Sequence, residues 1–236
     1  MSTAELMRGV QAISFDLDDT LWDCDSVIRQ AEQQAWQWLT EHTPRITEQH
    51  ERDIIGQLRR EIVDKEPHLV TDVTRLRHTI YKELLIRHDY HSELADQLFN
   101  VFYIARSNVT LYDGVLNMLD SIRQHFKVAA ITNGNADLSI VGIDGHFADV
   151  QRASVDNPPK PDAHMFEQCM KNLDLTSDRL IHIGDNPETD VCGAKRAGLK
   201  AIWFNQTGAT WPSELDPPDI EANSIDHLTQ LLLVNT

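Results

Sequence analysis

Two kinds of hydrophobic pattern alternate along the chain. The first is a short apolar run that ends in polar residues, as buried parallel strands do. Such runs occupy residues 12–15, 128–131, 180–183 and 200–204. The second is an apolar stripe at helical spacing, and it predicts helices over residues 115–122, 161–173, 191–197 and 225–233. Strands that alternate with helices predict a mostly parallel sheet covered on both faces.

Helical spacing repeats four times in succession after the first strand, with no strand pattern in between. The stripes predict helices around residues 27–39, 54–62, 73–84 and 94–105. Four amphipathic helices in a row predict a separate bundle. The sequence therefore predicts an α/β fold with a Rossmann-like parallel sheet core, helices on both faces and an inserted four-helix domain. The core would comprise residues 1–21 and 109–236, and the inserted domain residues 22–108.

The acidic composition excludes some partners. Asp and Glu number 37 against 21 Lys and Arg, so the formal net charge is −16. A surface of that charge repels polyanions, and nucleic acid is not an expected partner. No apolar run reaches the roughly 18 residues that span a bilayer, and the N-terminus has no signal-peptide pattern. Cys24, Cys169 and Cys192 lie far apart, which predicts reduced thiols. We expect a cytoplasmic protein with no membrane contact, whose oligomeric state stays open.

Polar clusters directly follow three of the predicted strands. In an open parallel sheet, ligands bind beyond the carboxyl ends of the strands. These clusters are therefore expected to meet at one edge of the sheet, together with a lysine that stands just before a predicted helix with proline in its first turn. The clusters are Asp16-Leu17-Asp18-Asp19-Thr20, Thr132-Asn133-Gly134 and Gly184-Asp185 through Asp190, and the lysine is Lys160, before Pro161.

The first cluster indicates a metal. Residues two apart on an extended chain point the same way, so the carboxylates of Asp16 and Asp18 share a face and repel each other. Asp185 adds a third acid from another strand end. A hard divalent cation with oxygen ligands resolves this conflict, and Mg²⁺ is the expected ion. Lys160 adds a second positive charge.

The second cluster offers groups that suit phosphate. Thr132 supplies a hydroxyl, and Asn133 and Gly134 supply backbone N–H groups. A cation and donors around phosphate oxygens, beside a carboxylate nucleophile, are what phosphoryl transfer needs. A second carboxylate can protonate the leaving alkoxide and later deprotonate water. The expected partner is a small phosphorylated metabolite.

At these residues the sequence resembles the haloacid dehalogenase-like hydrolase superfamily over the whole chain. The family motifs in order are D-x-D-x-T at Asp16, Asp18 and Thr20, a Thr at Thr132, a Lys before a helix at Lys160, and G-D-x-x-x-x-D at Gly184, Asp185 and Asp190. The resemblance implies a phosphatase with Asp16 as nucleophile and Asp18 as acid and base. It implies Mg²⁺ held by the Asp16 side chain, the Asp18 carbonyl and Asp185, with Asp190 steadying the metal site or orienting Lys160. The inserted helices would be the cap domain that chooses the substrate.

The inserted segment also resembles bacterial flavin mononucleotide phosphatases of this superfamily. The likeness lies in Glu66-Pro67 and in Asp72 to Arg77, and it implies FMN or the phosphorylated ribitylaminouracil of riboflavin synthesis as substrate. Trp22, Trp36 and Trp38 could stack on a flavin ring or belong to the core, and Arg75 and Arg77 could contact substrate or brace the helices. One departure is Asn157, where the family has a glycine. Asparagine tolerates left-handed backbone, so we expect the loop to survive.

Other functions stay open at this point. The cap could be permissive, which would give a broad sugar-phosphate or nucleotide phosphatase. A haloacid dehalogenase is a rival, but that branch of the family lacks the acid at Asp18. A phosphate-binding or phospho-acceptor regulatory protein is the rival from another class. The order of the motifs along the chain, with the nucleophile on the first strand, argues against a receiver domain.

Overall fold

The computed structural model describes residues 2–234 and contains a six-stranded sheet. The strand order is β3-β2-β1-β4-β5-β6, and all five neighbouring pairs are parallel. The strands are β1 (Ala12–Phe15), β2 (Lys127–Thr132), β3 (Asp149–Arg152), β4 (Leu180–Gly184), β5 (Lys200–Phe204) and β6 (Ile220–Ala222). All four apolar runs form strands, and the predicted α/β fold with a Rossmann-like parallel core is confirmed.

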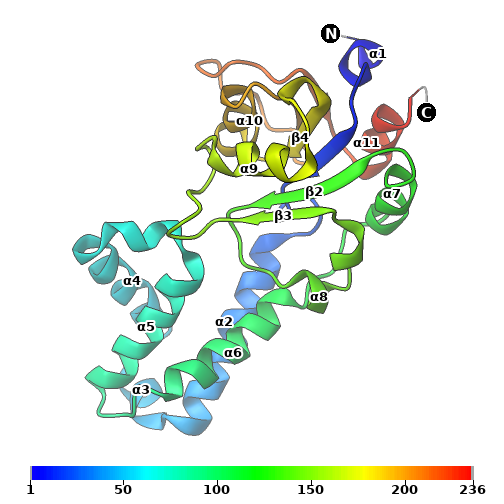
Figure 1. Ribbon diagram of the computed structural model, residues 1–236. Helices are drawn as coiled ribbons and strands as arrows, with labels where there is room; N and C mark the ends of the chain where they lie inside the picture. Colours follow the sequence, from blue (N-terminus) through cyan, green and yellow to red (C-terminus); the bar gives the residue numbers. More distant parts are fainter. Residues whose placement is uncertain (1, 235–236) are drawn as a thin grey trace. The chain divides into compact units, whose positions relative to one another are not determined.

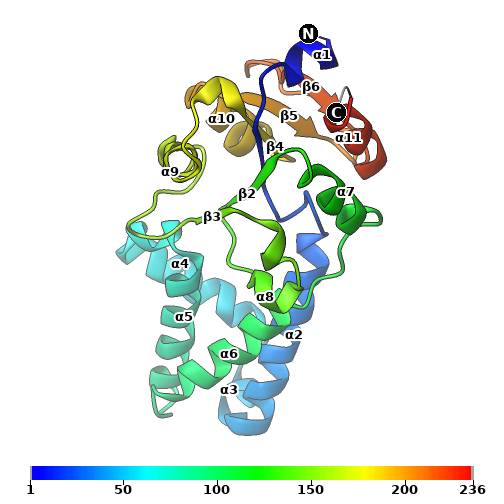
Figure 2. The ribbon, with the colours of Figure 1, turned by 45° about the vertical axis from the view of Figure 1, so that its right-hand side comes forward.

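Helices cover both faces of this sheet. On one face, α9 (His164–Leu173) and α10 (Gly193–Arg196) pack on β1, β2, β4 and β5 through a buried cluster that includes Ile131, Phe166 and Trp203. On the other side, α7 (Val115–Ile122) and α11 (Ile225–Leu232) lie next to each other (Figures 1 and 2). The buried side chains of α7 fall at the spacing of a helix face, which is why this short segment is helical.

The structure differs from the sequence prediction at three places in this part of the chain. The helix expected from Pro161 begins at His164, because the Asp162 carboxylate accepts the His164 N–H at 2.9 Å and a turn precedes the helix. The helix expected over 191–197 is a π-helical turn, Pro187–Cys192, followed by α10, and Gly198, at φ +81°, comes after its end. The edge strands β3 and β6 were not foreseen, because their sequences DVQR and IEA form no apolar run.

The remaining helices form a second compact unit, which comprises Cys24–Val109 and Asn135–Val141 and is called the helical unit below. The other unit, called the sheet unit, comprises Met1–Asp23, Thr110–Gly134 and Gly142–Thr236, and also holds α1 (Thr3–Met7). The helices of the helical unit are α2 (Cys24–His42), α3 (Pro44–Gln49), α4 (Asp53–Lys65), α5 (Val73–Arg87), α6 (Leu94–Ser107) and α8 (Leu138–Val141), with a 3-10 turn at Pro67–Thr71. The four predicted long helices are confirmed. That this unit acts as a cap stays a prediction.

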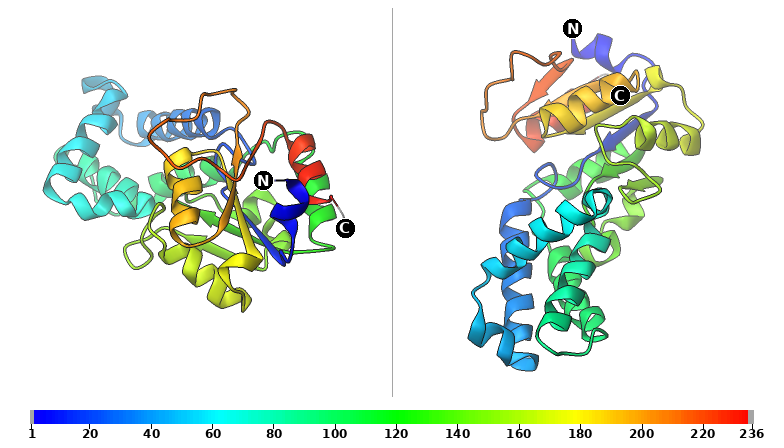
Figure 3. Two further views of the ribbon diagram at one scale, coloured as in Figure 1. Left: turned by 90° about the horizontal axis from the view of Figure 1, so that it is seen from above. Right: turned by 90° about the vertical axis from the view of Figure 1, so that its left-hand side faces the viewer.

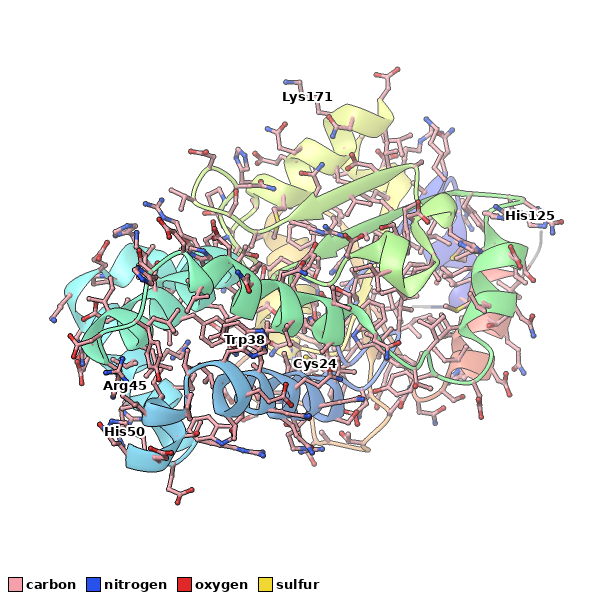
Figure 4. All side chains as sticks on the ribbon, turned by 90° about the horizontal axis from the view of Figure 1, so that it is seen from below. Cys24, Trp38, Arg45, His50, His125 and Lys171 are labelled. Carbon is pink, nitrogen blue, oxygen red and sulfur yellow. The ribbon has the colours of Figure 1, made fainter. Side chains whose placement is uncertain are left out.

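The helical unit has its own core. Helices α2 and α6 run side by side (Figure 3, right). Ala31 and Ala35 of α2 are buried, as is Ala105 of α6, and such small side chains let helix axes approach closely. Trp38, labelled in Figure 4, is partly buried against this core and stacks on His42 with ring centroids 4.4 Å apart. Within residues 2–234, no helix has the length and apolar character of a membrane span.

Candidate active site

Three acids come together at the carboxyl ends of two neighbouring strands. Asp16 directly follows β1, and Asp185 directly follows β4, which pairs with β1 so that Phe15 lies opposite Ile183. Asp190 comes from the π-helical turn after β4. Carboxylate oxygens of Asp16, Asp185 and Asp190 lie within 4.8 Å of one another. The expected convergence of the first and third clusters is therefore found.

Lys160 is the cation that contacts these acids. Its Nζ donates to Asp16 Oδ1 at 2.7 Å and to Asp190 Oδ1 at 2.6 Å, and its side chain is 1% exposed. Burial alone would lower the pKa of Lys160, but the two carboxylates outweigh that effect and raise it. Lys160 therefore stays charged in a buried position.

The two carboxylates that share this lysine respond differently. Burial raises the pKa of Asp16 well above its ordinary value; Lys160 opposes the rise, whereas the charges of Asp190 and Asp18 add to it. Burial also acts to raise the pKa of Asp190, but Lys160 and a hydrogen bond from His182 outweigh it, and the pKa of Asp190 falls below its ordinary value. Asp190 is therefore the firmly ionised partner of the lysine, and Asp16 is the acid that needs further positive charge.

The backbone around Asp190 is shaped to fit its carboxylate. Asn186 caps the turn with its side chain, and its own N–H donates to Asp190 Oδ2 at 2.9 Å. Gly184, the last residue of β4, leaves the space that this carboxylate fills. A Cβ added at Gly184 would come closer than 3.0 Å to the carboxyl group of Asp190. Glycine is required here by close approach, not by an unusual backbone angle.

A polar layer under the sheet edge supports Asp190. His182 on β4 is fully buried, with Nε2 3.4 Å from Asp190 Oδ1 and Nδ1 3.0 Å from Ser14 Oγ on β1. Burial lowers the pKa of His182 to about 4, so the ring is neutral near pH 7. A neutral ring satisfies both contacts when Nε2–H donates to Asp190 and Nδ1 accepts from the Ser14 hydroxyl. Sequence reasoning missed both residues, and the available signal was a polar residue inside each buried apolar run.

Asp18 has a partner of its own. The indole Nε1–H of Trp22 donates to Asp18 Oδ1 at 2.8 Å, and the two residues also form a backbone bridge. Trp22 is fully buried, so it offers no ring face to a ligand and cannot be one of the stacking tryptophans considered above. Asp19, between Asp18 and the turn, is exposed with φ +57°, in line with a structural role in the loop.

The second cluster lies at the end of β2 and is tied to the lysine loop. The Thr132 hydroxyl is buried and accepts the Gly134 N–H at 2.9 Å, so that N–H is already engaged. The Asn133 side chain donates to the Lys160 carbonyl at 2.9 Å and accepts the Lys160 N–H at 2.8 Å. Asn133 thus fixes the backbone from which Lys160 reaches the acids.

The loop before Lys160 keeps its shape in another way than expected. Asn157 does not take up a left-handed backbone; the non-glycine residues with positive φ among residues 2–234 are Asp19, Asp89 and Asp174. Its side chain instead donates to the Arg152 carbonyl at 2.8 Å, and its backbone pairs with Ser154. The asparagine that replaces the family's glycine therefore braces the loop through its amide.

The charge balance of the cluster fits a divalent cation. Burial raises the pKa of Asp185 to about 7, and repulsion from Asp190 and Asp19 adds to the rise. Lys160, whose two short contacts go to Asp16 and Asp190, does not contact Asp185. Carboxylate oxygens are the donors that Mg²⁺ prefers. These residues could hold such an ion, and its charge would favour the ionised forms of Asp16 and Asp185.

Comparison with known proteins identifies the family of the chain. Residues 10–198 match the haloacid dehalogenase-like hydrolase family, and the chain belongs to that family. It is 29% identical over 231 residues to the 5-amino-6-(5-phospho-D-ribitylamino)uracil phosphatase YigB of Escherichia coli, covering 94% of this chain and 96% of that one. It is 28% identical over 153 residues to a phosphoserine phosphatase of Thermus thermophilus, covering 62% and 59%.

A solved structure gives the same fold. The 2-haloacid dehalogenase from Pseudomonas syringae superposes with a TM-score of 0.90 at 30% identity, covering 96% of this chain and all of that one. With the family and the phosphatases among its relatives, this chain is an enzyme, a phosphatase of the haloacid dehalogenase-like type that acts on phosphorylated small molecules.

Proposed function

We propose that the enzyme is a magnesium-dependent phosphomonoesterase that works through a phosphoryl group on Asp16. The observation that carries the proposal is the buried Asp16 carboxylate at the end of β1, held at 2.7 Å by Lys160 beside Asp185. A carboxylate nucleophile must be ionised, and Lys160 supplies part of the charge that burial opposes. A bound Mg²⁺, held by the Asp16 side chain, the Asp18 carbonyl and Asp185, would supply the rest and would also stabilise charge on the phosphoryl oxygens.

Bond changes in the two half-reactions involve Asp16 and Asp18. An oxygen of Asp16 bonds to phosphorus as the ester P–O bond breaks, and the leaving alkoxide takes a proton from Asp18. Water then attacks the phosphorus, Asp18 takes the water's proton, and the Asp16–phosphorus bond breaks to release phosphate. The Trp22 indole, which donates to Asp18, would fix the orientation of that carboxyl group in both steps.

Thr132 and Asn133 would bind the phosphoryl group. Both stand at the carboxyl end of β2, beside β1, where open sheets bind ligands. Gly134, whose N–H donates to the Thr132 hydroxyl, would orient that hydroxyl for the phosphoryl group. Lys160 would also contact the phosphoryl oxygens, and Asp190 would hold the lysine in place.

For the substrate, we propose FMN or the phosphorylated ribitylaminouracil. Support comes from the named activity of the Escherichia coli relative and from the segment Glu66 to Arg77. Part of that segment has a structural role, since the Asp72 side chain caps α5 by accepting the Arg75 N–H at 2.8 Å. Selection would then come from other residues of the helical unit, which we propose acts as the cap domain.

The test is a comparison of kcat/KM for these two compounds with glucose 6-phosphate, pyridoxal phosphate and a nucleoside monophosphate, with Mg²⁺ and after chelation. We expect activity only with Mg²⁺ and a preference for FMN or the uracil compound of roughly ten- to a hundredfold, the range one hydrophobic contact surface supplies. If kcat/KM for glucose 6-phosphate equals or exceeds the values for FMN and the uracil compound, the substrate proposal fails and the broad-specificity phosphatase is the better assignment. Release of halide from a 2-haloacid in place of phosphate would favour the dehalogenase activity named for the Pseudomonas syringae structure.

A further inference from the structure

A cavity of about 520 Å³ lies within the helical unit, between α2, α4 and α5. Its volume falls in the range of about 300–1,000 Å³ that holds small organic ligands. None of the acids of the candidate active site lines it. The apolar and aromatic part of its lining comes from Ala35, Trp36, Leu39, Ile55, Val73, Leu76, Ile80 and Tyr81.

The polar part of the lining is strongly basic. Arg29, Arg52, Arg59 and Arg77 line the cavity, against the single acid Glu32. The whole chain carries a formal net charge of −16, so the local charge at this cavity is opposite in sign to that of the chain as a whole. Arg29, Arg52 and Arg59 are exposed to solvent, and their excess of positive charge attracts an anion that approaches the cavity.

The arginines differ in how far their charge is already neutralised. Arg77 pairs with Glu32 at 3.2 Å and lies over the Phe102 ring at 4.3 Å, so its guanidinium is held in place. Arg29 forms an ion pair with Asp25. Arg52 and Arg59 make no ion pair with any residue in the described range 2–234. These two arginines can therefore serve a bound anion without breaking an existing contact.

A glycine in α4 keeps one wall of the cavity open. Glycine inside a helix costs roughly 0.5–1 kcal/mol relative to alanine. At Gly56 neither usual reason for glycine applies, because φ is not positive and the nearest atom to an added Cβ is the Arg60 guanidinium at 3.7 Å, an ordinary contact. The consequence of having glycine there is open space in the cavity wall. A ligand would use that space.

We propose that this cavity binds an organic anion whose apolar body lies against Trp36 and the aliphatic wall and whose acidic group meets Arg59 and Arg52. Trp36 suits this role better than Trp38, because Trp36 lines the cavity and one face of Trp38 is covered by His42. The site lies wholly in the helical unit, and the proposal does not depend on the phosphatase chemistry. FMN is a probe of the required kind, with a flat ring system and a phosphate; riboflavin has the same ring without the charge.

The test is isothermal titration calorimetry in EDTA, where the uncompensated acids of the active site oppose phosphate binding. Wild type should bind FMN more tightly than riboflavin, and inorganic phosphate weakly. Arg59→Ala should weaken FMN binding roughly tenfold, as expected for one charge-assisted hydrogen bond, and should affect riboflavin little. Lys65→Ala is the matched control, because it removes one positive charge from the same helix outside the cavity. It should leave FMN binding as in wild type.

A second variant tests the space itself. Gly56→Leu should abolish binding of both FMN and riboflavin while keeping or raising the melting temperature, because leucine favours the helix. Gly56→Ala should raise the melting temperature and retain binding. Equal weakening by Arg59→Ala and Lys65→Ala, unchanged FMN binding in Gly56→Leu, or no FMN binding in wild type would each overturn the proposal.

The same anion could be the substrate or a separate effector, and kinetics distinguish the two sources. If the cavity holds the body of the substrate, Gly56→Leu raises KM for FMN far more than KM for p-nitrophenyl phosphate. If it holds an effector, riboflavin changes kcat for p-nitrophenyl phosphate in wild type, and Gly56→Leu removes that effect. Should neither kinetic change accompany binding that Gly56→Leu abolishes, the cavity is a ligand site without influence on turnover, and both functional roles are rejected.

Discussion

Replacing Lys160 with methionine removes the charge and keeps the length of the stem. In the wild type, Lys160 Nζ contacts Asp16 and Asp190 at 2.7 and 2.6 Å, with both lysine and Asp190 side chains 1% exposed. Removing one partner of a buried ion pair leaves an uncompensated charge and costs about 3–5 kcal/mol. We expect a loss of that size in the free energy of unfolding at pH 7, because Asp190 has no route to solvent.

The loss should depend on pH in a defined direction. In the wild type the pKa of Asp190 is lowered, so this residue contributes stability above its unfolded pKa of about 3.9 that is lost as pH falls through its folded pKa. In Lys160→Met the unpaired acids have folded pKa values above that reference, so the folded form gains protons and regains stability as pH falls. The difference between the two proteins should therefore be large at pH 7 and shrink toward pH 4.

Urea denaturation at several pH values between 4 and 8 measures this difference. The double variant Lys160→Met with Asp190→Asn is the control, because it removes one of the two stranded charges and should recover about half of the lost stability. A loss below about 1 kcal/mol at pH 7, typical of a surface pair, would show that the lysine is solvated in solution. A loss independent of pH would point to packing in place of charge.

Three further outcomes follow from the same geometry. Asp16→Asn should abolish phosphate release. The variant should unfold as cooperatively as the wild type, since Lys160 keeps its contact with Asp190. Residual turnover in the folded variant would show that Asp16 is not the nucleophile. Gly184→Ala should lose about 1–3 kcal/mol and most of its activity by displacing the Asp190 carboxyl group, whereas Gly145→Ala, where an added Cβ meets nothing within 4 Å, should change neither. Cys169 should resist a thiol reagent at pH 8 in the native protein, because burial and the nearby Asp149 raise the pKa of its thiol. The half-buried Cys24 should react. Labelling of Cys169 at the same rate as Cys24, mapped by mass spectrometry, would contradict this prediction.

The sequence predicted the central strands and the acids because both rest on local patterns. A central strand is buried on both faces and therefore reads as an apolar run, as Ala12–Phe15 does. The edge strands β3 and β6 have neighbours on one side only, so their side chains need not be apolar, and Asp149–Arg152 gave no strand pattern. Edge strands are thus the part of this sheet that periodicity does not reveal.

Contacts within the site were harder to predict than its members. Asp16, Asp185 and Lys160 were found from their places after strands or before a helix, but the choice of Trp22 as the partner of Asp18 depends on the turn geometry at Asp19. The cavity in the helical unit depends on three helices, α2, α4 and α5, whose residues lie up to 52 positions apart along the chain, from Arg29 to Tyr81. Helical periodicity predicts which face of each helix is apolar, but it cannot predict that the packing of three such faces leaves a cavity.

The buried polar residues under the site hold Lys160 in position, although they themselves do not face a substrate. In the proposed mechanism Lys160 points toward Asp16, yet a lysine stem is flexible and its entropy opposes a single orientation. Asp190 holds the ammonium group, and Asp190 is itself held by the Asn186 N–H, by His182 and by the absence of a side chain at Gly184. The contacts of Asp190 with Lys160 and His182 are buried, where a hydrogen bond is strengthened and an unsatisfied group is costly, so the loss of one should propagate to the next. Substitutions at Ser14 or Gly184 should therefore lower turnover in the same way as substitutions at Asp190, because each would misplace Lys160 beside Asp16, the proposed nucleophile.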